Sequence, residues 1–592
     1  MAKSIRIGGA SGFWGESAMS TPQLLAVEGL DYLVYDYLAE ITMSIMARAR
    51  MKDANAGYAA DFVTDVMTRN LKTIAAKGVK VLSNAGGVNP VACGAALQAL
   101  VAELGLSLKV AVVEGDDILD RAEQFAARKE MFSAADMPPR DRLASMNAYI
   151  GAGPIVAALQ AGADIVITGR CVDSAVTLAA AMHAFGWGAD DLDLLAAGSL
   201  AGHLLECGPQ STGGNFTDWQ AAGDIAQIGY PVAEMRADGT FAVFKPDGTT
   251  GVVSPASVAE QMLYEIGDPR AYILPDVVCD FSDVTITQDG PDRVEVAGAA
   301  GYPPTGQLKV SATWMDGFRA GQVVHFNGVG ARDKAVSYAE AALSRARNVL
   351  AKMGASDYRE VSVETFGGRP GEGAYEEISL KAAVRHDDAR AVGLFLKEFI
   401  GGALATPPGL HFFTGGGRPK PSPVVSLFSF LVEASTLDLK VTLDGKDIDY
   451  VAPEVSVQDV PVCETPAPQE IDARTDLIER PLEALAWARS GDKGDKANIG
   501  VIARHAAYMP WIWASLTPEV VKTVFGDLVQ GEVERFYLPG THSMNLLLHE
   551  ALGGGGVTSL RNDAQAKAYA QRLLATPIHL PAGLIVNEEG AA

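Results

Sequence analysis

The sequence lacks several features that would assign a protein class at once. Its five cysteines stand far apart at 93, 171, 207, 279 and 463, with no CxxC pair. This usage is typical of a reducing compartment and argues against a disulfide framework. No uncharged apolar run reaches the roughly 18 residues of a transmembrane helix, and the first residues lack the apolar core of a signal peptide. We therefore expect a soluble, cytoplasmic protein without a membrane partner.

Positive charge is also scarce, because 48 Lys and Arg stand against 72 Asp and Glu, a net charge of −24. Nucleic acids and anionic membranes bind clustered Lys and Arg, so we expect neither as a partner. A content of 48% hydrophobic and 20% charged residues is ordinary for a globular protein. A small anionic ligand stays compatible with this charge, because backbone donors and one or two Arg can override the overall field.

The common nucleotide and hydrolase motifs are missing as well. The glycines at 9, 12 and 15 do not have the GxGxxG spacing, and no GxxxxGK[ST] loop occurs. A GxSxG nucleophile elbow is absent, which leaves a Ser-His-Asp hydrolase without support. Nothing resembles a biotin-attachment site. We therefore expect no biotin, NAD or Walker-type ATP site and leave the cofactor open.

What is present is a repeated order of strand, turn and helix. Apolar strands are expected at Ile5–Ile7, Tyr32–Asp36, Lys80–Asn84, Val110–Glu114 and Ile165–Thr168, each followed by a turn and a helical pattern. The helix after the fourth strand is expected to run to about residue 128. This order is typical of βαβ winding. Uninterrupted apolar strands predict a parallel sheet covered on both faces, so residues 1–222 are interpreted as a parallel, doubly wound α/β part.

Three further regions follow along the chain. Between residues 223 and 450, short alternating runs joined by Asp-Gly turns predict an α+β part with antiparallel strands. Together, residues 1–450 form the predicted core. Residues 451–477 carry several prolines and few large apolar side chains, which predicts a linker. Residues 478–592 have the size and mix of a small two-layer α+β domain.

The strand ends predict a ligand cleft. In an open parallel sheet, ligands bind at the carboxyl ends of the strands, and Arg170 follows directly on the fifth strand. An Arg there can hold a carboxylate or phosphate through two parallel hydrogen bonds. The alternative is an internal ion pair between Arg170 and Asp173 that anchors the turn. We predict both residues as part of a catalytic site.

Two glycine-rich stretches, GGASGFWGES and NAGGVNP, follow the first and third strands. Their small residues would let backbone N–H groups approach a phosphate or carboxylate. The alternative is a pair of tight turns without a ligand. The ligand-binding residues predicted at these strand ends are Gly9, Ser11, Gly12, Asp36, Asn84, Gly86, Gly87 and Asn89.

A further segment, HLLECGPQSTGGNFTDW, places His203, Glu206 and Cys207 on one face if it is helical. This spacing suits acid–base chemistry or part of a metal site. A catalytic zinc needs about three protein ligands, and no second ligand cluster is evident, so we predict His203 and Glu206 as catalytic and no metal. Gly213, Gly214 and Asn215 complete the predicted ligand-binding set. The stretch SGDKGDKANIG at residues 490–500 is interpreted as a docking or assembly turn, or alternatively as an anion-binding nest.

Five stretches of the chain are distinctive: VYDYLAEITM, SNAGGVNP, AGADIVITGRCVDSAV, AGHLLECGPQSTGGNFTDW and ARSGDKGDKANIG. Together they resemble the acyclic terpene utilisation protein A (AtuA) family. The likeness covers nearly the whole chain and implies a large core followed by a small C-terminal domain. It also implies a place in bacterial pathways that degrade citronellol, geraniol and branched acids as acyl-CoA thioesters.

The resemblance and the strand-end residues together lead to the expected function. We expect a homo-oligomeric catabolic enzyme of lyase or hydratase type that acts on a branched-chain or terpenoid acyl-CoA, with CoA present as part of the substrate. One alternative is a non-catalytic accessory or scaffold subunit of an acyl-CoA carboxylase pathway. A weaker alternative is a nucleotide- or phosphate-dependent ligase.

Overall fold

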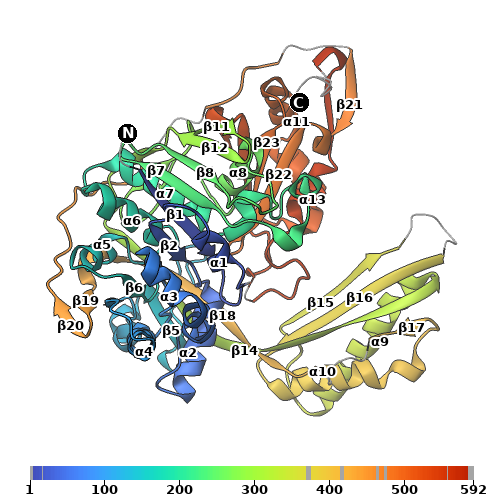
Figure 1. The fold of residues 1–592 in the computed structure, drawn as a ribbon. Coiled ribbons are helices and arrows are strands. Elements are labelled where there is room, and N and C mark those ends of the chain that lie inside the picture. The colour runs from blue at the N-terminus through green and yellow to red at the C-terminus, as the bar shows by residue number, and fades with distance from the viewer. Residues whose placement is uncertain are drawn as a thin grey trace. The chain divides into compact units, whose positions relative to one another are not determined.

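The computed structural model describes residues 4–16, 18–368, 375–413, 419–461, 466–471, 476–556 and 558–584. The predicted mixed α/β fold is confirmed, with several sheets drawn in Figure 1. The chain forms two compact units. Unit 1 comprises Met1–Thr313, Phe428–Ala551 and Ala566–Ala592, and unit 2 comprises Trp314–Leu427 and Leu552–Gln565.

The centre of unit 1 is a sheet with strand order β11-β12-β8-β7-β1-β2-β3-β6-β4-β19-β20. Its parallel strands are β1 (Ser4–Ser11), β2 (Tyr32–Tyr35), β3 (Lys80–Ser83), β6 (Ile165–Thr168) and β4 (Val110–Glu114). Antiparallel strands extend it beyond β1 and β4: β7 (Val232–Arg236), β8 (Phe241–Phe244), β12 (Arg293–Ala297), β11 (Thr285–Gly290), β19 (Lys440–Leu443) and β20 (Lys446–Ile448). Residues on both sides of position 222 therefore share one sheet.

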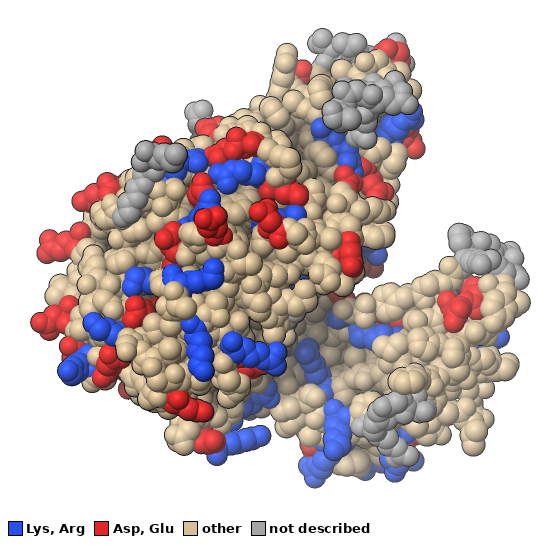
Figure 2. Space-filling model, in the orientation of Figure 1, with Lys and Arg blue, Asp and Glu red and all other residues tan. Residues whose placement is uncertain are grey.

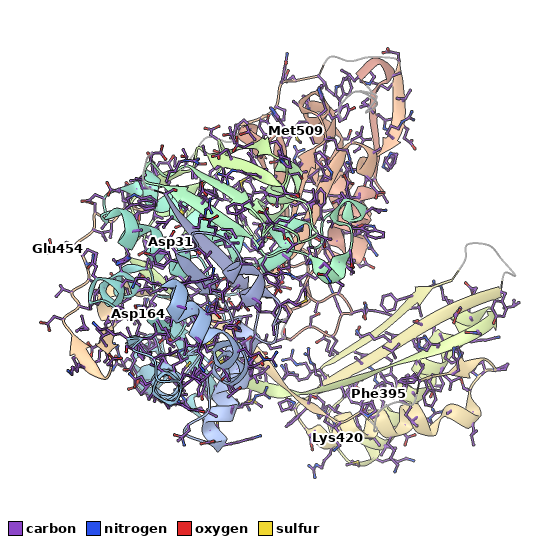
Figure 3. The ribbon with its side chains drawn as sticks, viewed as in Figure 1. Asp31, Asp164, Phe395, Lys420, Glu454 and Met509 are labelled. Atoms are coloured by element: carbon purple, nitrogen blue, oxygen red, sulfur yellow. The ribbon has the colours of Figure 1, made fainter. Side chains whose placement is uncertain are left out.

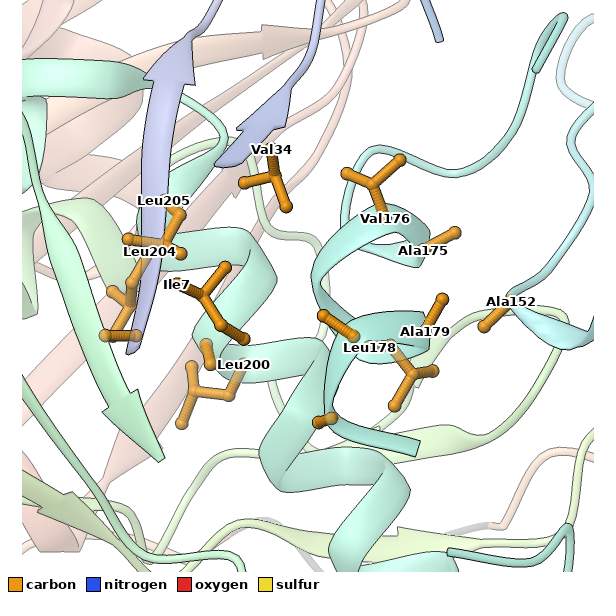
Figure 4. Packing of buried hydrophobic residues seen from close by; sticks show 14 of the residues in the cluster. Ile7, Val34, Ala152, Ala175, Val176, Leu178, Ala179, Leu200, Leu204 and Leu205 are labelled. Carbon is orange, nitrogen blue, oxygen red and sulfur yellow. The ribbon is translucent and has the colours of Figure 1, made fainter. Parts of the chain in front are cut away.

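Both faces of the parallel strands are buried, because their side chains alternate between two apolar clusters. Leu33 and Tyr35 pack with α1 (Ser20–Leu25), α2 (Glu40–Lys52), the π-helix Phe62–Met67, α3 (Thr68–Lys77) and α4 (Pro90–Glu103). Tyr32 and Val34 pack with α5 (Gly153–Gln160), α6 (Ala175–Phe185), α7 (Leu192–Leu205) and α8 (Pro255–Met262). Figure 4 shows Ile7 and Val34 of the sheet beside Leu178 and Leu200 of the helices. Apolar residues at every strand position thus produce the two-sided cover.

Three local expectations differ from the structure. β1 continues into the glycine-rich stretch as far as Ser11, because Gly8 and Gly9 fit closely against Leu24 and Leu205. The run after β4 forms a 3₁₀ helix, Leu119–Phe125, instead of an α-helix to about residue 128, and it buries only Ala122 and Phe125. A strand that the sequence did not predict, β5 (Leu143–Ala148), pairs with the long strand β14 (Gln307–Val329). A further small sheet contains β9 (Tyr272–Ile273), β10 (Val278–Asp280) and β13 (Ala300–Tyr302).

The C-terminal part of unit 1 is an antiparallel sheet with helices. Its strands, in the order β22-β23-β25-β24, are Ala486–Lys493, Lys496–Ala503, Ser543–Leu548 and Val533–Leu538. It also contains α11 (Met509–Ser515), α12 (Pro518–Phe525), α13 (Tyr569–Leu574) and the paired strands β21 (Leu477–Pro481) and β26 (Pro577–Pro581). The described residues between 451 and 471 have neither helix nor strand. The SGDKGDKANIG stretch forms the β22–β23 hairpin, turning at Gly494 and Asp495.

Unit 2 is a sheet with two helices on one face. Its strands are β14 from Trp314 onward, β15 (Glu360–Gly367), β16 (Tyr375–His386), β17 (Leu410–His411) and the first part of β18 (Ser422–Glu433), and its helices are α9 (Ala331–Lys352) and α10 (Ala389–Gly401). The helices bury Phe395, labelled in Figure 3, against Phe326 and Leu380 of the sheet. The segment 552–565 hydrogen-bonds to this sheet, for example from Arg319 Nη1 to the carbonyl of Ser559 at 3.0 Å.

The surface carries mixed charge. Figure 2 shows Lys and Arg interspersed with Asp and Glu over the face in view. Among the described residues, no helix combines the length and the apolar character needed to cross a lipid bilayer.

Candidate active site

The carboxyl ends of the central strands bring predicted residues together. Asp36 follows β2 and Asn84 follows β3, and both side chains are buried. The Asn84 amide donates to the Asp36 carboxylate, while its Oδ1 accepts from the backbone N–H of Tyr37 at 2.8 Å. Burial, together with the nearby charge of Asp173, raises the pKa of Asp36 well above its usual value.

Arg170 lies at the end of β6, and its side chain is only 4% exposed. Its Nη1 donates to Asp173 Oδ1 at 2.6 Å and to the carbonyl of Cys171 at 2.8 Å. The guanidinium carbon lies 4.0 Å from the ring centroid of Tyr149, a cation–π contact. The Arg170–Asp173 pair foreseen as an alternative is therefore present, but it uses only one end of the guanidinium.

A small cavity of about 10 Å³ lies beside Arg170, which is room for roughly one water-sized group. Its lining is Glu40, Met43, Asn147, Tyr149, Arg170, Ser311 and Thr313. Three buried polar atoms of this lining have no hydrogen-bond partner among the described residues: Asn147 Oδ1, Arg170 Nε and Ser311 Oγ. A buried polar atom without a partner costs about 1–3 kcal/mol. The cavity therefore suits one oxygen-sized polar group that can satisfy them.

Glu40 supplies a carboxylate to the same cavity. It accepts a hydrogen bond from the Tyr149 hydroxyl at 2.6 Å and a charged one from Lys309 at 3.3 Å. Burial alone would raise the pKa of Glu40. The charges of Lys309 and Arg170, with the Tyr149 hydrogen bond, instead hold this pKa below its usual range, so Glu40 is ionised at neutral pH.

Asp116, two residues after the end of β4, contacts the backbone of Arg170. Its carboxylate accepts from the N–H of Arg170 and from Asn147 Nδ2, both at 2.8 Å. Burial raises the pKa of Asp116 to about 7. This group fixes two residues of the cavity lining.

His203 and Glu206 form the contact that their spacing predicted. His203 belongs to α7 and is 1% exposed, and its Nδ1 lies 2.9 Å from Glu206 Oε1. Its other nitrogen, Nε2, lies 3.1 Å from the carbonyl of Met262, which can only accept, so Nε2 carries a proton. The Nδ1–Oε1 contact must then hold one further proton, on the imidazole or on the carboxyl.

Both members of this pair bind the shared proton more tightly than they would in water. Burial opposes the charged imidazole, but the charge and hydrogen bond of Glu206 raise the pKa of His203. Burial raises the pKa of Glu206, and the nearby charge of Asp173 adds to this effect. A buried carboxyl–imidazole pair that shares one proton is suited to general acid–base chemistry. The charge of Asp173 acts on Glu206, and Asp173 is also hydrogen-bonded to Arg170, which lines the cavity.

The predicted glycines lie where backbones approach closely. A Cβ on Gly9 would come 2.7 Å from the carbonyl of Leu205, and one on Gly12 would come 2.7 Å from that of Glu206. A Cβ on Gly86 would come 2.4 Å from the carbonyl of Thr168. Ser11 ends β1, Gly87 has a φ of +55°, and Asn89 caps α4 with a bond from Ala92 N–H. The Gly12 N–H donates to Glu16 at 2.6 Å. The ligand role of these residues stays a prediction.

Gly213, Gly214 and Asn215 lie against the C-terminal sheet. The carbonyl of Gly214 accepts from Arg489 Nη2 of β22 at 2.8 Å, and Gly213 and Asn215 both have positive φ, +102° and +54°. Two residues farther on, Thr217 Oγ1 accepts a hydrogen bond from the N–H of Ala488 at 3.0 Å and lies 3.1 Å from its carbonyl oxygen. The contacts described for this segment are intramolecular, and its proposed contact with a ligand stays a prediction.

The SGDKGDKANIG hairpin docks on the core of unit 1, as its docking interpretation predicted. Asn498 Nδ2 donates to the carbonyl of Leu263 at 2.6 Å, and Asn498 Oδ1 accepts from the N–H of Glu265 at 2.8 Å. A Cβ on Gly500 would come 2.4 Å from Leu263 Cβ. The hairpin is therefore held against the end of α8.

Several of these residues could not be found from the sequence. Glu40, Tyr149 and Lys309 come from three segments far apart in the chain, and Asn147 and Ser311 come from two strands that pair only in the fold. The described residues also contain one group whose ligand atoms are close enough to hold an ion, Glu532, Glu534 and His549, at one end of the paired strands β24 and β25. The cavity lining is a different set of residues.

Comparison with known families gives two matches. Residues 5–443 match the family described as "Acyclic terpene utilisation family protein AtuA", and residues 480–579 match the AtuA ferredoxin-like domain. The small C-terminal α+β domain is therefore ferredoxin-like. No curated protein and no solved structure matched the chain. Since the first match alone covers more than half of the 592 residues, the chain belongs to the acyclic terpene utilisation (AtuA) family.

Proposed function

We propose that this protein is a catabolic enzyme that acts on a branched-chain or terpenoid acyl-CoA thioester by lyase or hydratase chemistry. Family membership supports a place in acyclic terpene utilisation, and hence in catabolism. One observation carries the chemical part of the proposal. A buried Arg whose Nε has no partner among the described residues lines an oxygen-sized cavity and pairs with Asp173, and the charge of Asp173 acts on a carboxyl–imidazole pair that shares one proton.

Dehydration of a 3-hydroxyacyl thioester needs two things from an enzyme. A base must take the proton next to the carbonyl, and an acid must give a proton to the departing hydroxyl, so that water leaves and a double bond forms. The proton-sharing His203–Glu206 pair suits this exchange, with the ionised Glu206 accepting and the protonated pair donating. Hydration is the same sequence in reverse.

Negative charge develops on the thioester oxygen during such a reaction. A preformed N–H donor in a site without water stabilises this charge more strongly than water does. Arg170 Nε, buried and without a partner among the described residues, is such a donor. Asp173 and the Tyr149 ring hold the guanidinium in place. In this proposal the cavity accepts the single oxygen of the thioester. A cytoplasmic location and a homo-oligomeric state belong to the same proposal.

The test is to incubate the purified full chain with saturated, 2,3-unsaturated and 3-hydroxy branched acyl-CoAs and to follow the products by mass spectrometry. We expect gain or loss of one water mass with the unsaturated or 3-hydroxy substrate. Glu206→Gln should slow this change by about 10²–10⁴-fold. Glu532→Gln, a change at an exposed residue that directly precedes β24 and lies outside the site, serves as the matched control.

Two results would contradict the proposal. One is the absence of any mass change and of any binding with every acyl-CoA tested. The other is wild-type turnover in both Glu206→Gln and Arg170→Met. Co-purification with a carboxylase in the absence of turnover would favour the accessory-subunit alternative instead.

A further inference from the structure

The C-terminal ferredoxin-like domain brings a positive charge close to the His203–Glu206 pair. Lys493 is the last residue of β22, and its side chain is exposed. Its Nζ lies 5.8 Å from the ring centroid of Tyr272. The ring of Tyr272 in turn lies 5.8 Å from the ring of His203. Lys493 and His203, 290 residues apart, therefore both lie next to the same tyrosine ring.

The position of Lys493 is set by rigid docking of its hairpin. A Cβ on Gly491, two residues earlier, would come 2.7 Å from side-chain atoms of Tyr264 and Glu265. On the partner strand, Gly500 and Asn498 make the close contacts with the end of α8 described above. Backbone packing this tight leaves the turn little freedom to slide, because any shift of the hairpin would cause overlap.

The ammonium of Lys493 is not neutralised locally. Among the described residues, no carboxylate lies within ion-pair distance of its Nζ, although Lys567 nearby pairs with Glu265 at 3.2 Å and lies 3.5 Å from Asp492. The charged and titratable groups facing the His203–Glu206 pair are Asp36, Asp173, Cys207, Tyr272 and Lys493. Burial raises the pKa of Cys207 and of Tyr272, so both are uncharged near neutral pH, and Lys493 is the one cation among these five groups.

The charge of Lys493 changes the pKa of both members of the pair in the same direction. Burial and Glu206 dominate the pKa of His203, and the charge of Lys493 lowers it. Burial raises the pKa of Glu206, and His203 and Lys493 lower it. A cation at this place therefore favours release of the proton that the pair shares.

We propose that Lys493 is a positioning residue of the active site, through which the ferredoxin-like domain controls how readily His203 and Glu206 give up their shared proton. The domain is then part of the catalytic machinery and not only a docked module. The catalytic consequence rests on the proposed function above, whereas the electrostatic effect can be measured without any substrate.

The experiment is a pH titration of the full chain by NMR, with ¹³Cε1-labelled histidine. Loss of one resonance in His203→Gln assigns His203. We expect the His203 transition to move to higher pH in Lys493→Met and to stay at the wild-type position in Lys493→Arg. Lys496→Met is the matched control, because Lys496 lies in the same hairpin but its Nζ is directed at the ring of Phe132, 5.5 Å away. The other histidine resonances report whether each variant is folded.

An unchanged His203 titration in Lys493→Met, including the absence of a transition in both proteins, would overturn the inference. An equal shift in Lys496→Met would do the same, because the effect would then be a general one of the hairpin. If the shift is found but no acyl-CoA is converted, the electrostatic inference stands and the proposed function fails. With an active substrate, the acidic limb of the pH profile of kcat/KM should move in the same direction as the titration.

Discussion

Removal of the Arg489 guanidinium tests how the ferredoxin-like domain is held to the core. Arg489 Nη2 lies 3.0 Å from Glu260 Oε2, and the two side chains are 4% and 0% exposed. The same guanidinium donates to the carbonyl of Gly214 at 2.8 Å and to Gln261 Oε1 at 3.2 Å. In Arg489→Met, the Glu260 carboxylate retains the bonds from Thr217, from its N–H at 3.1 Å and its Oγ1 at 2.5 Å.

The expected cost follows from this burial. Removing one partner of a fully buried ion pair costs about 3–5 kcal/mol, because the other charge stays in the interior without its partner. Removing both charges avoids that penalty. The double variant Glu260→Gln with Arg489→Met should therefore be more stable than Arg489→Met alone, by at least about 2 kcal/mol.

The loss of stability in Arg489→Met should also depend on pH. Burial raises the pKa of Glu260, although Arg489 and Thr217 oppose this. A carboxyl whose folded pKa lies above its unfolded value stabilises the fold below the unfolded pKa, and this contribution is lost as the pH rises through the folded pKa. Loss of Arg489 raises the folded-state pKa of Glu260 further. The difference in stability between wild type and Arg489→Met should therefore grow from acidic to neutral pH.

The measurement is hydrogen exchange of the β22 and β23 peptides, followed by mass spectrometry, with urea unfolding at about pH 5 and about pH 8. Exchange in these strands reports undocking of the domain even if the core stays folded. The reasoning is refuted if Arg489→Met lies within about 1 kcal/mol of wild type, or if the double variant is no more stable than the single one.

Two further outcomes are expected from the central sheet. Gly86→Ala would place a Cβ 2.4 Å from the carbonyl of Thr168 and 2.7 Å from Pro90 Cα, so the thermal midpoint of this variant should fall by the equivalent of about 1–3 kcal/mol. Gly267→Ala is the control, because its Cβ would meet nothing within 4 Å, and its midpoint should equal that of wild type. Equal midpoints for the two variants would contradict the packing argument. Because burial raises the pKa of Asp116 to about 7, stability should decline from about pH 4, near the usual pKa of Asp, to about pH 7. Asp116→Asn should flatten this decline in urea titrations, and an unchanged slope would show that another group causes it.

The central sheet could be predicted because its strands carry their signal locally. Tyr32–Tyr35 is apolar at every position, and the two faces of the sheet bury alternate residues of it. β5 carries no such signal, since Ser145 and Asn147 stand among its six residues. These side chains are buried through bonds to Thr313 and Asp116, partners that no local pattern shows.

The same distinction separates the site residues that were predicted from those that were not. His203 with Glu206, and Arg170 with Asp173, are each three residues apart, so one turn of backbone brings them into contact. Glu40 is different, because its partners Tyr149 and Lys309 lie 109 and 269 residues away in the chain. Only the pairing of β5 with β14 and the position of α2 bring that set together.

The glycine-rich motifs show why a sequence pattern can indicate the right place for a different physical reason. Their composition suggested backbone donors for an anion, but their glycines allow close contacts next to the His203–Glu206 pair and Arg170. Gly12 touches the backbone of Glu206, and Gly86 touches that of Thr168, two residues before Arg170. Gly491 lets the hairpin that carries Lys493 approach Tyr264. A side chain at any of the three would displace a neighbour of the proton-sharing pair or of the cavity. Glycine at these positions is therefore required to build the site, whether or not a ligand also binds the backbone there.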